Sequence, residues 1–210
     1  MNKKQFTAEQ LLTRWEIRRE VQNIMGKYSQ SYCIKQEGAL PQFWSGRDDI
    51  SLGLNQGYYI GQAAVNGYYA AIEAETKLAS QLIAARFPQK LQGKTEEELF
   101  GVGQISYRPI DTAVIEVADD LQTAKGLWVV RGMVEKVTTS GPISYWDFSY
   151  WAVDFILEAG AWKIWHMTMF TDIQCPVGGN WGKDTMYPHE GVEIPEPTVK
   201  EHQYTGYGED

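Results

Sequence analysis

The chain has 210 residues, a formal net charge of −8, eight Trp, twelve Tyr and seven Phe. This length suits one domain with a sizeable core, and the negative charge argues against nucleic acid, whose phosphates attract basic surfaces. No run approaches the roughly 18 apolar residues of a membrane-spanning helix, so we expect no membrane partner. Cys33 and Cys175 lie far apart and the three histidines do not cluster, so we expect a cytoplasmic protein without disulfides or a metal site.

Two amphipathic helices are predicted in the first half of the chain. Thr7 to Gln10 has the sequence of a capping box, in which Thr7 accepts a backbone hydrogen bond and Gln10 reaches back. Apolar residues then recur at helical spacing: Ile17, Val21, Ile24, Tyr28 and Tyr32. Gly38 and Pro41 interrupt this pattern, and a second helix is predicted from Gly61 to the residues before Pro88.

The remaining pattern is that of β-strands. Ile50, Leu52 and Leu54 alternate along one face of a predicted strand, and residues 89–100 read as a charged connector. From Val102 onward four β-type segments follow, punctuated by turn residues at 126, 140–142 and 159–160. A helix, a strand, a second helix and a run of antiparallel strands predict an α+β protein whose sheet curls around the helices.

The end of the chain differs in composition from the rest. Residues 174–210 are rich in Gly and Pro without periodicity, so we divide the chain into a main domain, 1–173, and a C-terminal tail, 174–210. The tail contains Trp181, Tyr187, Tyr204 and Tyr207, which is too aromatic for a purely solvated extension. We therefore expect at least residues 174–190 to be ordered.

Three segments together resemble the SnoaL-like branch of the nuclear transport factor 2-like superfamily. They are FWSGRDDISL (43–52), GYYIGQAAVNGYYAAI (57–72) and GAWKIWHM (160–167), and the resemblance extends over roughly residues 10–173. It implies a cone-shaped domain: a strongly curved mixed or antiparallel sheet, wrapped around the N-terminal helices and open at one end. It also implies a small-molecule cavity, with Tyr59 facing it and Tyr68 and Tyr69 in the core.

Two enzymes of this superfamily, ketosteroid isomerase and bile acid dehydratase, suggest catalytic residues. Both have a tyrosine near the end of the first helix, where this chain has Tyr28. A two-residue turn at Ala159-Gly160 sets Asp154 opposite Trp165. In the isomerase, the residue opposite the equivalent of Trp165 is its protonated aspartate. We therefore predict that Tyr28 and Asp154 donate hydrogen bonds to an enolate oxygen.

The same strand pairing divides the residues of the last hairpin between two faces. The predicted cavity face carries Tyr150, Ala152, Asp154, Trp165, Met167 and Met169, and the other face carries Trp151, Val153, Phe155, Trp162, Ile164 and His166. The second face is too apolar for open water, so we expect a second subunit or the tail to cover it. The predicted ligand-binding residues are Trp44, Leu54, Asn55, Tyr59, Trp128, Tyr150, Trp165 and Met167.

The resemblance leaves the general base open. The isomerase's base position corresponds to Leu54, with Asn55 beside it, and the dehydratase's second helical carboxylate corresponds to Cys33. Asp111 or His189 could supply the base. The sequence thus predicts a cofactor-independent isomerase or dehydratase for a hydrophobic cyclic carbonyl compound, in a homodimer or other homo-oligomer. The alternative is a non-catalytic ligand-binding or assembly module whose partner is a small hydrophobic or aromatic molecule.

Overall fold

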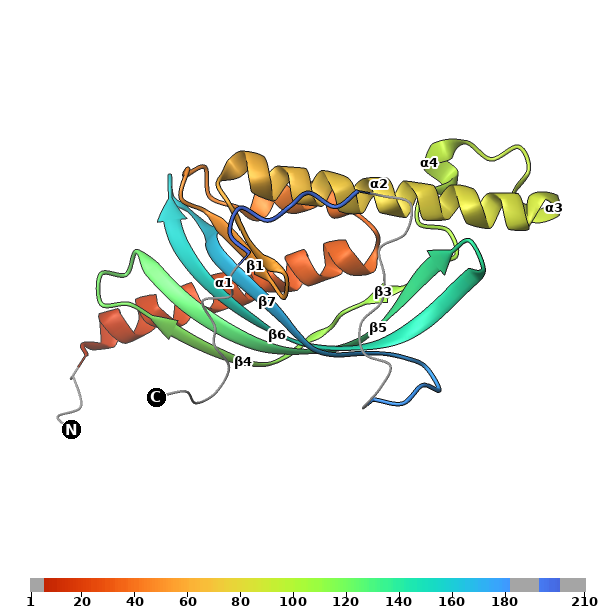
Figure 1. The fold of residues 1–210 in the computed structure, drawn as a ribbon. Helices are drawn as coiled ribbons and strands as arrows, with labels where there is room; N and C mark the ends of the chain where they lie inside the picture. Colours follow the sequence, from red (N-terminus) through yellow and green to blue (C-terminus); the bar gives the residue numbers. More distant parts are fainter. Residues whose placement is uncertain (1–5, 182–192, 201–210) are drawn as a thin grey trace.

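The computed structural model describes residues 6–181 and 193–200. A curved sheet carries the helices on its concave side (Figure 1). The helices are α1 (Ala8–Cys33), the 3₁₀ helix η1 (Glu37–Phe43), α2 (Gln62–Arg86), α3 (Pro88–Leu91) and α4 (Glu96–Leu99). The strands are β1 (Ser51–Leu54), β2 (Gly57–Ile60), β3 (Ser106–Tyr107), β4 (Ile110–Val117), β5 (Thr123–Thr138), β6 (Gly141–Glu158) and β7 (Ala161–Pro176).

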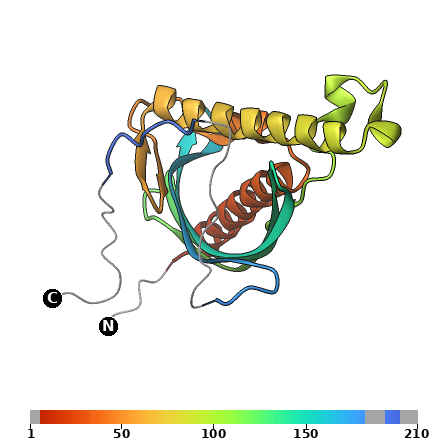
Figure 2. The same ribbon diagram turned by 45° about the vertical axis from the view of Figure 1, so that its right-hand side comes forward.

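The strands form one mixed sheet in the order β2-β1-β7-β6-β5-β3, with β4 also paired to β5. β1 runs parallel to β7, and the other pairs are antiparallel. The long strands β5, β6 and β7 bend around α1, while α2 lies across the open side of the arc (Figure 2). This arrangement is the predicted α+β cone.

The core lies between α1 and the concave face of the sheet. Val21, Met25 and Tyr28 of α1 are fully buried against large side chains of the central strands. Those strand residues include Trp128, Trp151, Val153, Phe155, Ile164 and Met167. Burying so many large apolar side chains supplies most of the driving force for folding.

Several local predictions are confirmed. Thr7 and Gln10 form both hydrogen bonds of the capping box at the start of α1. The second helix ends at Arg86, before Pro88, and Ala159 and Gly160 form the two-residue turn between β6 and β7. The prediction of a connector over 89–100 missed two short helices, α3 and α4, of which the second begins with its own capping box at Thr95.

The face assignment of the last hairpin is wrong for β6 and for the first residues of β7, because Phe155, Trp162 and Ile164 are buried in the core. The predicted pairing holds from Phe155↔Ile164 to Glu158↔Ala161, but an irregularity then makes Asp154 pair with His166, so that Trp165 has no cross-strand partner in this ladder. One extra residue in β7 reverses the alternation on that strand. As a result Met167 and Met169 share the inner face with Trp162 and Ile164. On β6, Trp151, Val153 and Phe155 lie on this inner face, where α1 covers them, so neither a second subunit nor the tail is needed to do so.

The predicted tail contributes to the fold at two places. β7 continues to Pro176, past the boundary at residue 173, and the Trp181 ring packs on Phe148 at a centroid distance of 5.3 Å. The second place is residues 193–200, which we call the strap and which pairs with β2 through the bridge Tyr58↔Val199. Residues 182–190, the rest of the segment predicted to be ordered, lie outside the described residues, as do Tyr187, His189, Tyr204 and Tyr207.

Candidate functional site

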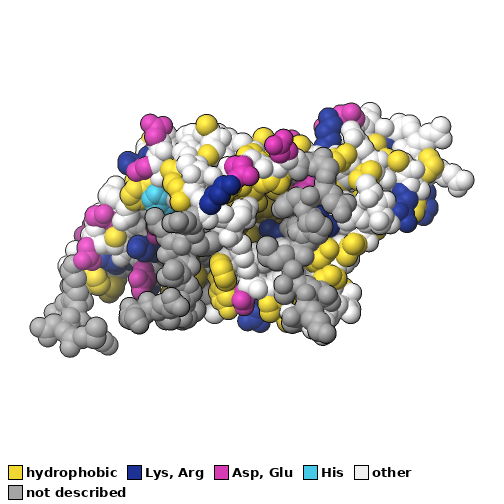
Figure 3. All heavy atoms as spheres, viewed as in Figure 1, with side chains coloured by type: hydrophobic (Ala, Val, Ile, Leu, Met, Phe, Trp, Pro, Cys, Tyr) yellow, Lys and Arg dark blue, Asp and Glu magenta, His cyan; other side chains and the backbone are white. Residues whose placement is uncertain are grey.

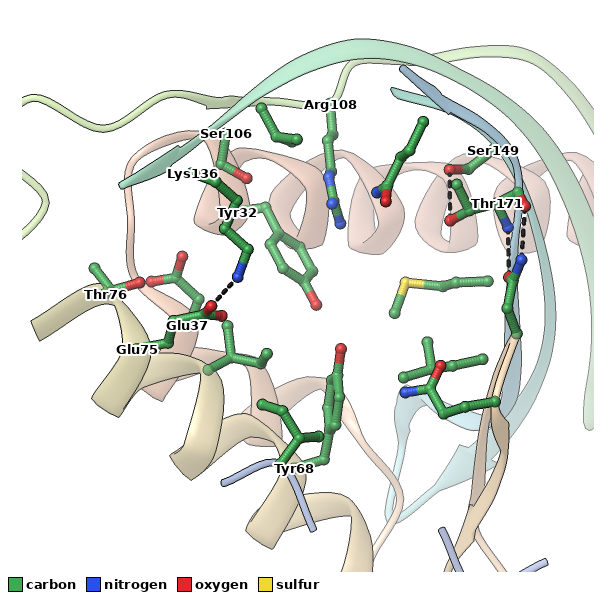
Figure 4. Close-up of a pocket in the computed structure, with 18 of the residues that line it drawn as sticks. Tyr32, Glu37, Tyr68, Glu75, Thr76, Ser106, Arg108, Lys136, Ser149 and Thr171 are labelled. Carbon is green, nitrogen blue, oxygen red and sulfur yellow. Dashed lines mark hydrogen bonds and ion pairs between the residues drawn. The ribbon is translucent and has the colours of Figure 1, made fainter. Parts of the chain in front are cut away.

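A cavity of about 570 Å³ lies between the sheet, the end of α1, η1, α2 and the strap. The molecular surface is hollowed below α2, with hydrophobic side chains visible in the hollow (Figure 3). Its wall is mixed: Leu54, Trp151 and Met169 supply apolar surface. Charged side chains, Glu37, Glu75 and Lys136, gather at one end, and the hydroxyls of Ser149 and Thr171 lie at the other (Figure 4). The charged lining residues are Lys35, Glu37, Glu75, Arg108, Glu135, Lys136, Glu196 and Lys200.

The end of α1 places Lys35 in this wall. Two backbone hydrogen bonds, from Gln36 to Ser31 and from Lys35 to Tyr32, close the helix in a Schellman motif. Lys35 occupies the position of that motif that usually holds glycine, and its φ is 58°. A side chain is unfavourable in this left-handed conformation, so the chain holds a lysine here at a conformational cost. The Lys35 side chain is only 14% exposed.

Glu37, at the start of η1, is the most deeply buried carboxylate of the cavity wall. Its side chain is 2% exposed, and its Oε1 lies 3.9 Å from Lys35 Nζ. Its other oxygen, Oε2, is buried and has no hydrogen-bond partner among the residues that the structure describes. Burial raises the pKa of Glu37, and the positive charge of Lys35 offsets this only in part. The site therefore holds a carboxylate whose lone pairs are available to a ligand.

Two tyrosines present their hydroxyls to the hollow from opposite sides. Tyr32 comes from the last turn of α1 and Tyr68 from α2, and their rings point toward one another across the cavity (Figure 4). Burial raises the pKa of Tyr32, so its phenol stays protonated near neutral pH and can donate a hydrogen bond. The Arg108 guanidinium lies over the Tyr32 ring, 5.4 Å from its centroid, which fixes the orientation of that ring.

A buried carboxylate behind the wall organises one side of the cavity. Asp147 is 0% exposed and accepts hydrogen bonds from Arg108 Nη2 at 3.0 Å, Ser149 Oγ at 2.7 Å and Gln174 Nε2 at 2.8 Å. All three donors line the cavity. On the other side Lys136 pairs with Glu75 (Figure 4). These two ion pairs satisfy most of the buried charge and leave Lys35 and Glu37 as the more loosely paired groups.

The strap forms part of the cavity mouth. Ile194, Pro195 and Pro197 line the cavity, and the Tyr59 hydroxyl donates to the Pro195 carbonyl at 2.8 Å. The Ile60 amide donates to Thr198 Oγ1 at 3.0 Å. Residues two apart in an extended segment present their N–H groups to the same side, and two of those positions here are prolines, which have no N–H. Within the described part of the strap, backbone pairs with backbone of β2 through one two-bond bridge, Tyr58↔Val199.

The two predicted catalytic residues do not meet. Tyr28 is 0% exposed, and its hydroxyl lies 2.6 Å from that of Tyr69, which also accepts a hydrogen bond from Trp44 Nε1. Tyr28 thus belongs to the packed core. Asp154 is half-buried on the outer face of β6, between Lys125 of β5 and His166 of β7. The prediction that Asp154 faces the cavity is wrong, because Asp154 alternates along β6 with Trp151, Val153 and Phe155, which occupy the inner face.

The predicted ligand-binding residues divide into two groups. Leu54, Asn55 and Tyr59 line the cavity, and their role in binding stays a prediction. Asn55 is held by a pair of hydrogen bonds with the Thr171 backbone. The others lie elsewhere: Trp44, Trp128 and Met167 are buried in the core, Trp165 donates to Asp49, and Tyr150 is 46% exposed on the outer face. His166 also lies on the outer face, where its Nδ1 is 3.0 Å from Ser51 Oγ.

Sequence reasoning missed Lys35, Glu37, Tyr32 and Asp147 as a set. Two signals were present in the sequence. The resemblance placed a helical carboxylate at Cys33, only one turn before Glu37, and Asp147 stands between Trp146 and Phe148 in the same aromatic setting that drew attention to Asp154. Among the described residues, no group of three or more His, Cys, Asp or Glu side chains could hold a metal ion.

No protein-family model and no curated protein matches the sequence. Solved structures are similar in fold. They include a type 2 hexachlorocyclohexane dehydrochlorinase, LinA (15% identity over 84% of this chain and 97% of that one, TM-score 0.54). A second is a putative scytalone dehydratase from Novosphingobium aromaticivorans (11% identity over 91% of this chain and 99% of that one, TM-score 0.53). A third is Aln2 from a Streptomyces species (14% identity over 75% of this chain and 91% of that one, TM-score 0.50).

At these identities the likeness shows the fold alone. It confirms the α+β cone that the resemblance to the SnoaL-like branch of the nuclear transport factor 2-like superfamily implies. None of the helices in the described ranges, 6–181 and 193–200, is both long and apolar enough to cross a membrane.

Proposed function

We propose that this protein is a cofactor-independent isomerase or dehydratase that acts on a small cyclic carbonyl compound held in the cavity. The observation that carries the proposal is Glu37, whose buried Oε2 lacks a hydrogen-bond partner among the described residues and belongs to the cavity wall. A carboxylate with a raised pKa is a stronger base than an ordinary one, which suits proton removal from carbon near neutral pH.

The arrangement around Glu37 supports one order of events. Glu37 takes a proton from the carbon next to the carbonyl, and the electron pair of that C–H bond moves toward the carbonyl oxygen. The Tyr32 and Tyr68 hydroxyls donate hydrogen bonds to this oxygen as it becomes negative. Return of the proton to another carbon gives isomerisation, whereas loss of a β-hydroxyl group with a proton, as water, gives dehydration. These tyrosines take the role predicted for Tyr28 and Asp154.

The wall supports a substrate that is apolar on one side and polar on the other. Leu54, Trp151 and Met169 offer a surface for a ring, whereas Arg108 and Lys136 lie toward the polar side. Two of the similar structures are a dehydrochlorinase and a putative dehydratase, and both names describe eliminations. An elimination begins with removal of a proton from carbon, or includes it, so these names favour the same class of chemistry.

The alternative is a non-catalytic ligand-binding or assembly module of the same fold. It is favoured by the ion pairs Arg108–Asp147 and Lys136–Glu75, which occupy several of the charged groups of the site with one another. Under this alternative a small molecule binds in the cavity and leaves unchanged.

We further propose that the protein self-associates as a homodimer through the outer face of the sheet, where Leu127, Tyr150 and Phe170 are each more than 40% exposed. A reducing, cytoplasmic setting is supported by Cys33 and Cys175, which are both free thiols.

The test measures exchange of α-protons of cyclic ketones with D₂O by NMR, since this reports enolisation without knowledge of the natural substrate. We expect the protein to accelerate exchange and Glu37→Gln to lower the acceleration by about 10²–10⁴-fold. Glu97→Gln is the matched control, because Glu97 is an exposed carboxylate of α4 that does not line the described cavity. If the wild type and Glu37→Gln bind the ketone and exchange its α-protons at equal rates, the enzyme proposal is wrong and the non-catalytic binding module is favoured.

A further inference from the structure

The cavity wall contains two buried lysines in different electrostatic situations. Lys136 is in direct contact with the Glu75 carboxylate, which holds its ammonium group in place (Figure 4). Lys35 Nζ is 3.9 Å from the nearest carboxylate oxygen, that of Glu37, which is too far for a hydrogen bond. Both lysines line the same cavity, so a small molecule that enters has access to either.

The surroundings of Lys35 favour its neutral form. Burial lowers the pKa of Lys35, and the nearby Arg108 guanidinium lowers it further, against the opposing effect of Glu37 and smaller ones of Glu135 and Cys33. A lysine that is desolvated beside another cation is activated as a nucleophile. The stem of its side chain packs on Gly101, where a larger residue would meet it. The amine therefore lies at a fixed place in the wall.

The backbone also points to a role for this side chain. Lys35 stands at the glycine position of the Schellman motif that ends α1, with φ 58°. A glycine here would end the helix with less strain. Strained residues that the surrounding structure holds in place are concentrated at functional sites.

We propose that Lys35 Nζ forms an imine with carbonyl compounds that enter the cavity. The neutral amine nitrogen adds to the carbonyl carbon, and the π electrons move to oxygen. One proton leaves nitrogen and one reaches oxygen, to give a carbinolamine. Glu37, whose Oε1 is 3.9 Å from Lys35 Nζ, lies close enough to carry the proton from nitrogen to oxygen. It can then deliver a second proton to the hydroxyl group of the carbinolamine, which leaves as water while the C=N bond forms. The products are the imine and one water molecule, so no oxidant or reductant is required.

This inference goes beyond the proposed function, because it needs no removal of a proton from carbon. If the imine forms first, its nitrogen takes the place of the carbonyl oxygen as the electron acceptor when Glu37 removes the α-proton. A protonated imine nitrogen withdraws electrons from the neighbouring carbon more strongly than a carbonyl oxygen does, which makes the α-proton easier for Glu37 to remove.

Reductive trapping tests the imine on the full chain. The protein is incubated with benzaldehyde or cyclohexanone and sodium cyanoborohydride, which reduces an imine to a stable secondary amine, and the labelled lysines are identified by peptide mass spectrometry. Lys136 is held by the Glu75 carboxylate, whereas Lys35 Nζ makes no hydrogen bond to Glu37, so we expect labelling of Lys35 to exceed that of Lys136 by about tenfold near neutral pH.

Lys35→Gly is the control variant, because it removes the amine at a position where glycine is the favoured residue and so preserves the helix end. It should abolish the dominant adduct without transferring it to Lys136. Labelling of Lys35 no greater than that of Lys136 would overturn the proposal. Loss of α-proton exchange in Glu37→Gln without a Lys35 adduct would refute the imine alone, whereas an adduct with unchanged exchange would refute the proposed base alone.

Discussion

Two groups of tyrosines lie within one helical turn of each other in this protein, and they differ in what their hydroxyls contact. In the closed group, Tyr28 and Tyr69 lie with their hydroxyls 2.6 Å apart, and Trp44 donates to the second of them. In the open group, Tyr32 and Tyr68 point into the cavity (Figure 4). The hydroxyls of the closed group lie against one another in the core, whereas those of the open group point into the space that a ligand would occupy.

This difference teaches that the residue type and the helix position do not decide a tyrosine's role. Tyr28 and Tyr32 are four residues apart on the same face of α1, and both are buried. Only the second reaches the hollow, because η1 and the sheet close over the first.

The largest effect should come from the carboxylate beneath the open group. Asp147→Ala leaves the largely buried Arg108 guanidinium without its ion-pair partner and removes the acceptor of Ser149 and Gln174. We expect the free energy of unfolding to fall by about 3–5 kcal/mol, measured by urea unfolding. Asp147→Asn keeps the shape and one acceptor, so it should cost less. Equal small losses for both variants would show that this carboxylate does not organise the wall.

Removing one hydroxyl from each group should separate stability from function. Tyr28→Phe should lower the free energy of unfolding by about 1–3 kcal/mol, since it breaks a buried hydrogen bond, and should leave α-proton exchange unchanged. Tyr32→Phe should do the reverse, slowing exchange with a smaller effect on unfolding. The comparison of the two groups fails if the two variants behave alike in both measurements.

Glu37→Gln should stabilise the protein in a pH-dependent manner. Burial raises the pKa of Glu37 above its ordinary value of 4.5, so the folded state favours the protonated form. The corresponding stability is fully present below that ordinary value and is lost as pH rises through the raised pKa. Glutamine resembles the protonated form, so we expect a gain of about 0.5–2 kcal/mol near pH 7–8, vanishing below about pH 4. Thermal unfolding across this pH range measures it, and a gain independent of pH would contradict the assignment.

The smallest effects should come from the strap. Thr198→Ala removes the acceptor of the Ile60 amide, and Pro197→Ala adds a backbone donor next to it. We expect opposite changes in amide hydrogen exchange at Ile60, faster in the first variant and slower in the second, each corresponding to about 1 kcal/mol or less. Global unfolding should hardly move. Unchanged exchange in both variants would mean that this pairing contributes nothing to closure of the mouth.

Much of the fold could be predicted from the sequence because the local signals agreed. The capping box at Thr7, the helical spacing behind it and the turn at Ala159-Gly160 each predicted an element that the structure contains. The four-residue helices α3 and α4 escaped because a single turn carries too little periodicity to be recognised.

The candidate site could not be predicted to the same extent, and the reason lies in β6 and β7. Both faces of β6 carry large apolar residues, such as Trp151 inside and Tyr150 outside, so the hydrophobic pattern does not specify which face is buried. The packing of α1 on Trp151, Val153 and Phe155 decides it, and on β7 the unpaired Trp165 shifts the alternation, with its indole held by Asp49 from a distant part of the chain. A contact of that kind leaves no local signature.

The strap also has a consequence for the order of folding. The partners of its hydrogen bond from Ile60 to Thr198 are 138 residues apart in sequence, so this contact closes one of the longest loops in the molecule. Contacts between residues so far apart in sequence are among the slowest to form. We therefore expect the strap to join the mouth of the cavity late in folding, after the neighbouring strands of the hairpins have paired.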